Sequence, residues 1–92
     1  MKSILQFNKE CYFCKSIVNL HCHHIYSGTA NRKVSENNGF KVWLCNYHHN
    51  GSNNSVHFNK EMNLKLKKDC QKEFEKHHDR NEFLKLIGKS YL

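Results

Sequence analysis

The sequence predicts a small α+β fold, and three observations lead to this expectation. Two short segments, residues 20–25 and 40–44, alternate between apolar and polar residues, as half-buried strands do. Apolar residues recur at every fourth position between residues 60 and 76, which predicts an amphipathic helix. Two pairs of metal-ligand residues flank the alternating segments, which indicates that a metal ion supports a thin core.

The two alternating segments are expected to pair as a β-hairpin. In the first segment His23 and His24 are adjacent and therefore point to opposite faces of the strand. The connection, residues 26–39, is polar and contains two glycines, so we expect a long loop there. The second segment would turn Phe40 and Val42 toward the core.

Two helices are expected to follow the hairpin. Asn59 has the side chain of a helix N-cap, and the first helix should cover residues 60–76. Its inward stripe is Met62, Leu66, Cys70 and Phe74. A shorter helix is expected over residues 81–87, with Gly88 as its stop. The apolar residues that it should bury are Phe83, Leu84 and Ile87.

The chain is expected to form one domain over residues 1–92, because no linker or repeat divides it. Residues 9–58 would hold the metal ligands and the hairpin, residues 59–92 the helices, and residues 1–8 a short strand or ordered arm. No segment has the length and apolarity of a membrane span or a secretory signal. We therefore expect a cytoplasmic protein with reduced cysteines and no membrane partner.

The first group of ligands consists of two matched pairs. Cys11 and Cys14 are separated by two residues, and Cys45 and His48 repeat this spacing. The spacing lets a tight turn present both side chains to one ion, and thiolates and imidazoles are the ligands of structural zinc. We expect these four residues to hold one structural Zn²⁺. The alternative is that the cysteines are small buried apolar residues, as we expect for the remaining two.

A second group of histidines remains once these ligands are assigned: His23, His24, His49 and His57. A single histidine is usually a surface or core residue, but two adjacent pairs beside the zinc ligands indicate a second site. Neutral imidazole ligates metals and accepts protons near neutral pH. Phosphodiester hydrolysis needs an activated water, a proton acceptor and positive charge near the phosphate, and this group could provide for all three.

The order of these residues resembles that of HNH nucleases. In that family a His-His or Asp-His pair ends the first strand of a hairpin, and the last His opens a helix after the second strand. Many members also carry zinc knuckles of the form CxxC and CxxCH. The resemblance is to the small phage and prophage type and covers about residues 11–57. It implies a ββα-metal, treble-clef-like core and a metal-dependent endonuclease that acts in a bacterial cell.

The resemblance also implies roles for the second group. His23 and His49 become ligands of a catalytic divalent metal, and His24 becomes the general base. Imidazole suits Zn²⁺ and Ni²⁺, but a site that keeps several waters can use Mg²⁺ or Mn²⁺, so the identity of this metal is open.

The chain departs from the family pattern at two positions. Phe40 stands where the family has its middle Asn, and Asn37 or Asn38 could brace the loop instead. Asn53 stands where the family often has its last ligand. His57 could replace that ligand if the Gly- and Ser-rich stretch before it forms a loop.

The charge of the chain favours a nucleic-acid partner. Its 15 Lys and Arg outnumber its 8 Asp and Glu, for a net charge of +7, which favours binding to phosphate polyanions. We expect Arg32 and Lys33, at the tip of the hairpin connection, to contact phosphates of DNA. Two alternatives are a non-catalytic zinc module that binds nucleic acid or a phage or host protein, and a metal-dependent RNase that acts on RNA.

Overall fold

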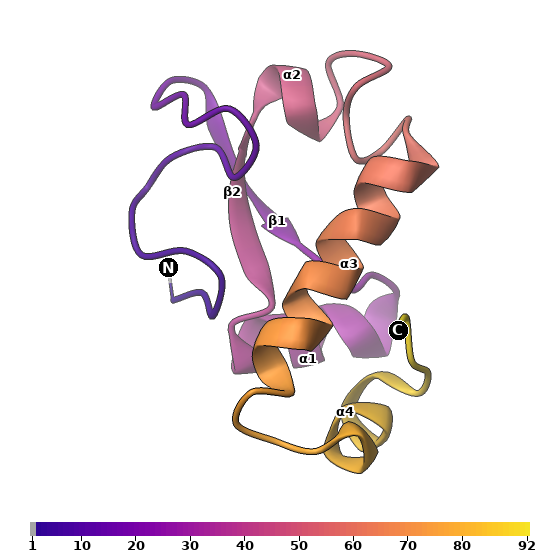
Figure 1. Ribbon diagram of the computed structural model, residues 1–92. Helices are drawn as coiled ribbons and strands as arrows, with labels where there is room; N and C mark the ends of the chain where they lie inside the picture. The colour runs from indigo at the N-terminus through magenta and orange to yellow at the C-terminus, as the bar shows by residue number, and fades with distance from the viewer. Residues whose placement is uncertain (1) are drawn as a thin grey trace.

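The computed structural model describes residues 2–92 and has an α+β architecture, as expected, with a two-stranded sheet and four helices in this part of the chain (Figure 1). The elements in order are β1 (Leu20–His24), α1 (Thr29–Asn38), β2 (Lys41–Cys45), α2 (Asn46–His49), α3 (Lys60–Phe74) and α4 (Arg80–Ile87). No helix formed by residues 2–92 has the length and apolarity that spanning a bilayer requires.

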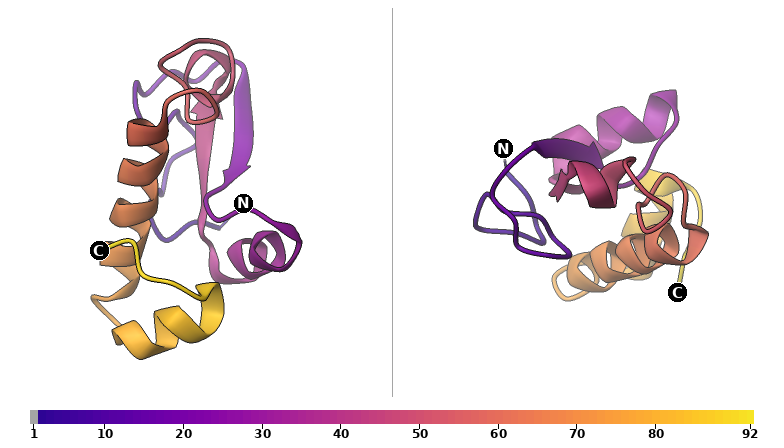
Figure 2. Two further views of the ribbon diagram at one scale, coloured as in Figure 1. Left: turned by 90° about the vertical axis from the view of Figure 1, so that its right-hand side faces the viewer. Right: turned by 90° about the horizontal axis from the view of Figure 1, so that it is seen from above.

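The two strands form an antiparallel hairpin whose register runs from Leu20 opposite Cys45 to His24 opposite Lys41. Seen from above, the hairpin lies between α1 and α3 (Figure 2). Strand β2 is the inner strand, because Val42 and Leu44 are fully buried. Strand β1 is more exposed, with His21 and Cys22 at the surface and His23 and His24 half-buried.

Aromatic side chains fill the core between the hairpin and the last two helices. Phe40 lies at its centre, with ring centroids 5.5 Å from those of both Tyr26 and Phe74. Phe83 brings α4 onto this cluster, 5.5 Å from Tyr26. Such edge-to-face pairs contribute about 0.5–1.5 kcal/mol each beyond the area they bury. The packing fixes the end of β1, and with it the direction of the histidines.

The two C-terminal helices confirm the expectation, with shifted bounds. Asn59 caps α3, since its side chain accepts hydrogen bonds from the backbone N–H groups of Glu61 and Met62. Gly88 ends α4 in a left-handed conformation with φ of 97°. One expected core residue is wrong: Leu84 is exposed, and Leu86 packs against the core in its place.

The connection between the strands contradicts the expectation of a loop, because most of it is helix α1. Gly28 and Gly39 lie at its two ends with positive φ of 94° and 72°, where side-chain-bearing residues are strained. The helix is polar and exposed, and Ser35 is its buried residue. It therefore lacks the apolar period by which a helix is recognised in a sequence.

The N-terminal segment and Cys22 also differ from expectation. Residues 2–8 form no strand, although a hydrogen bond from Ile4 N–H to the Gly39 carbonyl ties the segment to the end of α1. Cys70 is buried as expected, but Cys22 is exposed. The face of β1 that carries Cys22 borders a cleft instead of the core.

We expect Ser35→Ala to lower the free energy of unfolding by about 1–3 kcal/mol, the usual cost of leaving a buried polar group unpaired. The buried Ser35 hydroxyl accepts a hydrogen bond from Tyr26 N–H and donates one to the Tyr26 carbonyl. Urea denaturation of the metal-loaded protein measures the change. Ser27→Ala, at an exposed position of the same connection, is the control. Equal denaturation midpoints for Ser35→Ala and the control would show that the Ser35 hydroxyl does not stabilise the contact between α1 and Tyr26.

Candidate metal centres

The first candidate centre joins two parts of the chain that are distant in sequence. Cys11 and Cys14 come from a turn ahead of β1, Cys45 ends β2, and His48 lies on α2. Their ligand atoms all lie within 4.8 Å of one another, so the group could hold a metal ion. The two matched pairs therefore converge as the spacing predicted.

The distances within this group fit a tetrahedral ion. Sγ of Cys14 lies 3.7 Å from Sγ of Cys45, and Nδ1 of His48 lies 3.6 Å from Sγ of Cys11 and 3.3 Å from Sγ of Cys45. A zinc ion bound at ordinary lengths would separate two sulfurs by about 3.8 Å and a sulfur and a nitrogen by about 3.6 Å. The contact between the two sulfurs is far longer than the roughly 2.05 Å of a disulfide.

The surroundings of the thiols also suit a cation. Burial raises the pKa of Cys11, but backbone N–H groups of Cys45, Cys14 and Phe13 outweigh it, so the pKa lies below its ordinary value. The Ser16 N–H lowers the pKa of Cys14, but burial and the neighbouring thiols bring it above its ordinary value. Crowded thiolates repel one another, and a divalent ion between them offsets this repulsion.

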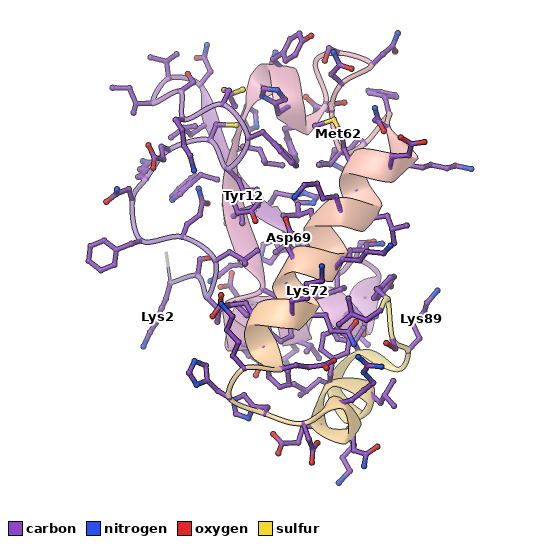
Figure 3. The ribbon with its side chains drawn as sticks, in the orientation of Figure 1. Lys2, Tyr12, Met62, Asp69, Lys72 and Lys89 are labelled. Carbon is purple, nitrogen blue, oxygen red and sulfur yellow. The ribbon has the colours of Figure 1, made fainter. Side chains whose placement is uncertain are left out.

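Contacts around the first centre bind it to the rest of the fold. Tyr12 N–H donates to the Trp43 carbonyl in β2 at 2.9 Å. The Tyr12 hydroxyl donates to a carboxylate oxygen of Asp69 at 3.0 Å, and the two side chains meet between the N-terminal segment and α3 (Figure 3). The first centre is thus the point where the N-terminal segment, the hairpin and α3 are held together.

The second candidate centre consists of His23 on β1, His49 on α2 and His57 in the turn before α3. One nitrogen from each lies within 4.8 Å of the others, and the Nε2 atoms of His49 and His57 are 3.2 Å apart. Two imidazoles bound tetrahedrally to one zinc ion would have nitrogens about 3.4 Å apart. The observed arrangement therefore could hold a metal ion.

One unpartnered polar atom supports a cation site here. Nε2 of His23 is buried and has no hydrogen-bond partner among the described residues; Nδ1 of His49 also lacks one, but it is the second nitrogen of a ring whose Nε2 faces His57. A buried nitrogen without a partner is destabilising and rare in folded proteins, so it calls for a missing ligand or water. Burial, and then the nearby His49 and His57, lower the pKa of His23 to about 3. The ring is therefore neutral, as metal ligation requires.

The turn between α2 and α3 delivers His57 to this centre. Its backbone returns along α2, with hydrogen bonds from Val56 N–H to the His48 carbonyl and from His57 N–H to the His49 carbonyl. The stretch before His57 is the loop on which the prediction depended. Asn53, which lies in this stretch, is exposed and lies outside the cluster.

His24 points to the other side of β1, as strand alternation requires. Its Nε2 lies 3.2 Å from a carboxylate oxygen of Glu36 on α1, and Glu36 also pairs with Lys41 on β2. His24 nevertheless borders the same cleft as the three histidines of the second centre, a hollow of about 630 Å³. Glu36 was not anticipated, because the sequence indicated a loop where α1 lies.

Arg32 and Lys33 lie on α1 and not on a loop tip, although they flank the cleft as expected. Arg32 borders the cleft that holds the histidines. Lys33 lines a neighbouring hollow together with His24, Arg32 and Glu36. Both are exposed, and one helix turn presents both positive charges beside His24.

The substitutes proposed for the missing Asn are wrong. Phe40 is fully buried in the core, Asn37 is exposed, and Asn38 donates to the Val34 carbonyl of its own helix. The bracing contact between α1 and the end of β1 comes from Ser35 instead. A lone serine in a polar stretch carries no sequence signal of this role.

Comparisons of the chain with known protein families, with curated proteins and with solved structures gave no match. The two clusters of ligand atoms therefore carry the functional argument.

Proposed function

We propose that the protein is a metal-dependent endonuclease of the HNH type, with a ββα-metal, treble-clef-like core, and that it hydrolyses phosphodiester bonds in DNA. One observation carries the proposal: three histidines that could hold a metal ion and a fourth that faces away from them border a single cleft. The three metal ligands and the proton acceptor, His24, are thereby kept apart, yet all of them can reach a phosphate bound in that cleft.

The two centres have different tasks in this proposal. Cys11, Cys14, Cys45 and His48 would hold a structural zinc ion, because all four positions of a tetrahedron are filled by protein atoms. His23, His49 and His57 would hold the catalytic divalent ion and leave positions open for water and phosphate. Such an ion, when bound, polarises the phosphate and stabilises the leaving oxygen.

His24 is the general base of the proposed reaction. With Nε2 directed to Glu36, its Nδ1 is the nitrogen that takes the proton from the attacking water. The carboxylate of Glu36 fixes the ring orientation and stabilises the imidazolium that forms. Lys41, which is largely buried, pairs with Glu36 and holds it in place. Lys41, Glu36 and His24 thus form a chain of side-chain contacts that runs from β2 through α1 to the general base.

Arg32 and Lys33 would hold the substrate. We expect Arg32→Ala/Lys33→Ala to make the salt dependence of DNA binding shallower by about one to two units of log K per log salt. The cleavage rate should fall as well, because the phosphate is no longer held against His24. Fluorescence anisotropy over a series of KCl concentrations measures the slope. Lys72→Ala/Lys85→Ala, which removes the same charge elsewhere, is the control. An unaltered slope would remove these residues from the interface.

Incubation of supercoiled plasmid with the protein tests the activity itself. The zinc-loaded protein is freed of loosely bound metal and then supplied with Mn²⁺, Mg²⁺, Ni²⁺ or Zn²⁺. We expect relaxed or linear plasmid with at least one of these ions and none with the protein alone. Binding of DNA without cleavage under every condition would replace the proposal by a non-catalytic zinc module, and cleavage of RNA alone would replace it by an RNase.

A further inference from the structure

A second positive site lies on the side of the molecule where the C-terminal tail meets α3. The ammonium nitrogens of Lys67 and Lys89 lie 5.2 Å and 4.9 Å from the ring centroid of Tyr91. Lys67 belongs to α3, whereas Lys89 and Tyr91 belong to the tail after α4. Two cations therefore converge on one aromatic ring.

The position of the tail is set by a buried polar side chain. The amide of Gln71, which is fully buried, accepts a hydrogen bond from Tyr91 N–H and donates one to the Ser90 hydroxyl. The Tyr91 ring also packs against Tyr26, with centroids 5.6 Å apart. These contacts place Lys89 beside Lys67, so the pair of charges is a consequence of the fold.

The two charges are not balanced within the described part of the chain. Neither Lys67 nor Lys89 has a carboxylate of residues 2–92 within ion-pair distance. By contrast, Lys65 of α3 pairs with Asp69, and Lys76, just after α3, pairs with Glu73. Burial, and then the charge of Lys89, lower the pKa of Lys67. Like charges held near a partly buried position repel one another, and an anion between them would offset this repulsion.

A hydrogen bond connects Lys67 to the segment that leads into the histidine cleft. The Tyr26 hydroxyl donates to the Lys67 carbonyl at 2.7 Å, and Ser27, the next residue in the chain, lines the cleft. Figure 2 (left) shows the tail crossing in front of α3, with β1 and α1 to the right of α3 in the same view. A strand whose phosphate occupies the histidine cleft could therefore reach Lys67 and Lys89 on one side and Arg32 on the other.

We propose that Lys67 and Lys89, held over Tyr91, bind the phosphate backbone of a nucleic-acid strand that passes through the histidine cleft. The proposal rests on the proposed function, because it identifies the surface that guides the substrate of that same site. The ligand is a phosphodiester, and Tyr91 keeps both ammonium groups in position by cation–π attraction. Arg32 and this pair would then contact the strand on opposite sides of the scissile phosphate.

The test is DNA binding by Lys67→Gln/Lys89→Gln, measured by fluorescence anisotropy with a labelled oligonucleotide and no added divalent metal. Glutamine keeps most of the aliphatic stem, so the packing changes little. We expect the salt slope to become shallower by about 1.5–2 units, since each lysine neutralises about one phosphate. The variant Lys67→Arg/Lys89→Arg should restore the wild-type slope. A slope equal to wild type in the glutamine variant would overturn the proposal.

Three controls keep the outcomes distinct. Lys72→Gln/Lys85→Gln carries the same charge change on other faces, and an equal shift in this variant would show a net-charge effect and overturn the site. The single change Lys89→Gln, at an exposed position, should shift the slope by about one unit even if the double variant does not fold. Binding to phosphatidylserine vesicles but not to DNA would identify a lipid ligand and also overturn it. Because no cleavage is measured, failure of the nuclease proposal shows separately in the plasmid assay.

Discussion

Replacing Cys45 by alanine is expected to unfold the protein or make it insoluble. Cys45 is one of four residues that could hold a metal ion and that bring together the N-terminal segment, the hairpin and α2, and the hydrophobic core is small. Structural zinc contributes about 10–16 kcal/mol of binding free energy in zinc-finger peptides, which is comparable to the total stability of about 5–15 kcal/mol of most domains. Circular dichroism and the zinc content of the purified protein measure the outcome.

Cys22→Ala is the matched control for this experiment. Cys22 is exposed and lies outside the ligand cluster, so its replacement should leave the zinc content unchanged and the protein folded. The wild-type protein should carry one tightly held zinc ion and melt at a lower temperature after treatment with a strong chelator. A folded, zinc-free wild-type protein whose melting curve is insensitive to chelator would show that the first centre is only a cluster of buried cysteines.

His24→Ala is expected to keep the fold and the structural zinc but to lose cleavage by about 10²- to 10⁴-fold, the usual contribution of a positioned base. His24 is outside both clusters of ligand atoms, and its Nε2 contacts the Glu36 carboxylate. Loss of the ring therefore removes a proton acceptor and no ligand. Plasmid cleavage under the best metal condition measures the effect.

The neighbouring histidines should fail in a different way. His23→Ala and His49→Ala remove ligands, so their residual activity should rise with metal concentration, whereas that of His24→Ala should not. His78→Ala, at an exposed position on the turn before α4, is the control and should cleave like wild type. Full cleavage by His24→Ala with all four metals would exclude it from the mechanism.

The parts of the fold that were predicted from the sequence are those with local signals. A period of two residues indicated both strands, a period of four indicated α3, and the spacing of Cys11 and Cys14 indicated a knuckle. Helix α1 was missed because its only buried residue is the polar Ser35. The helix is stabilised by contacts with the end of β1. Because these contacts are not made by a stripe of apolar residues, the sequence shows no helical period at this position.

In the candidate site, too, the residues with a sequence signal were predicted and those placed only by tertiary structure were missed. The convergence of His23 and His49 was expected from the resemblance of the motif to that of HNH nucleases. His57 depended on the path of a turn, which the sequence indicated but could not trace. Glu36 was not predicted, because its role requires α1 to place a carboxylate opposite β1. Lys67 and Lys89 were equally hidden, since 22 positions of sequence separate them.

The central claim is that one chain holds two metal ions at separate sites, one for folding and one for chemistry. Calorimetric titration of Mn²⁺ or Ni²⁺ into the zinc-loaded protein tests it most directly. We predict that one further ion binds per chain, that His24→Ala retains this ion, and that His49→Ala loses it. Absence of a further ion, or equal binding by His49→Ala, would contradict the account.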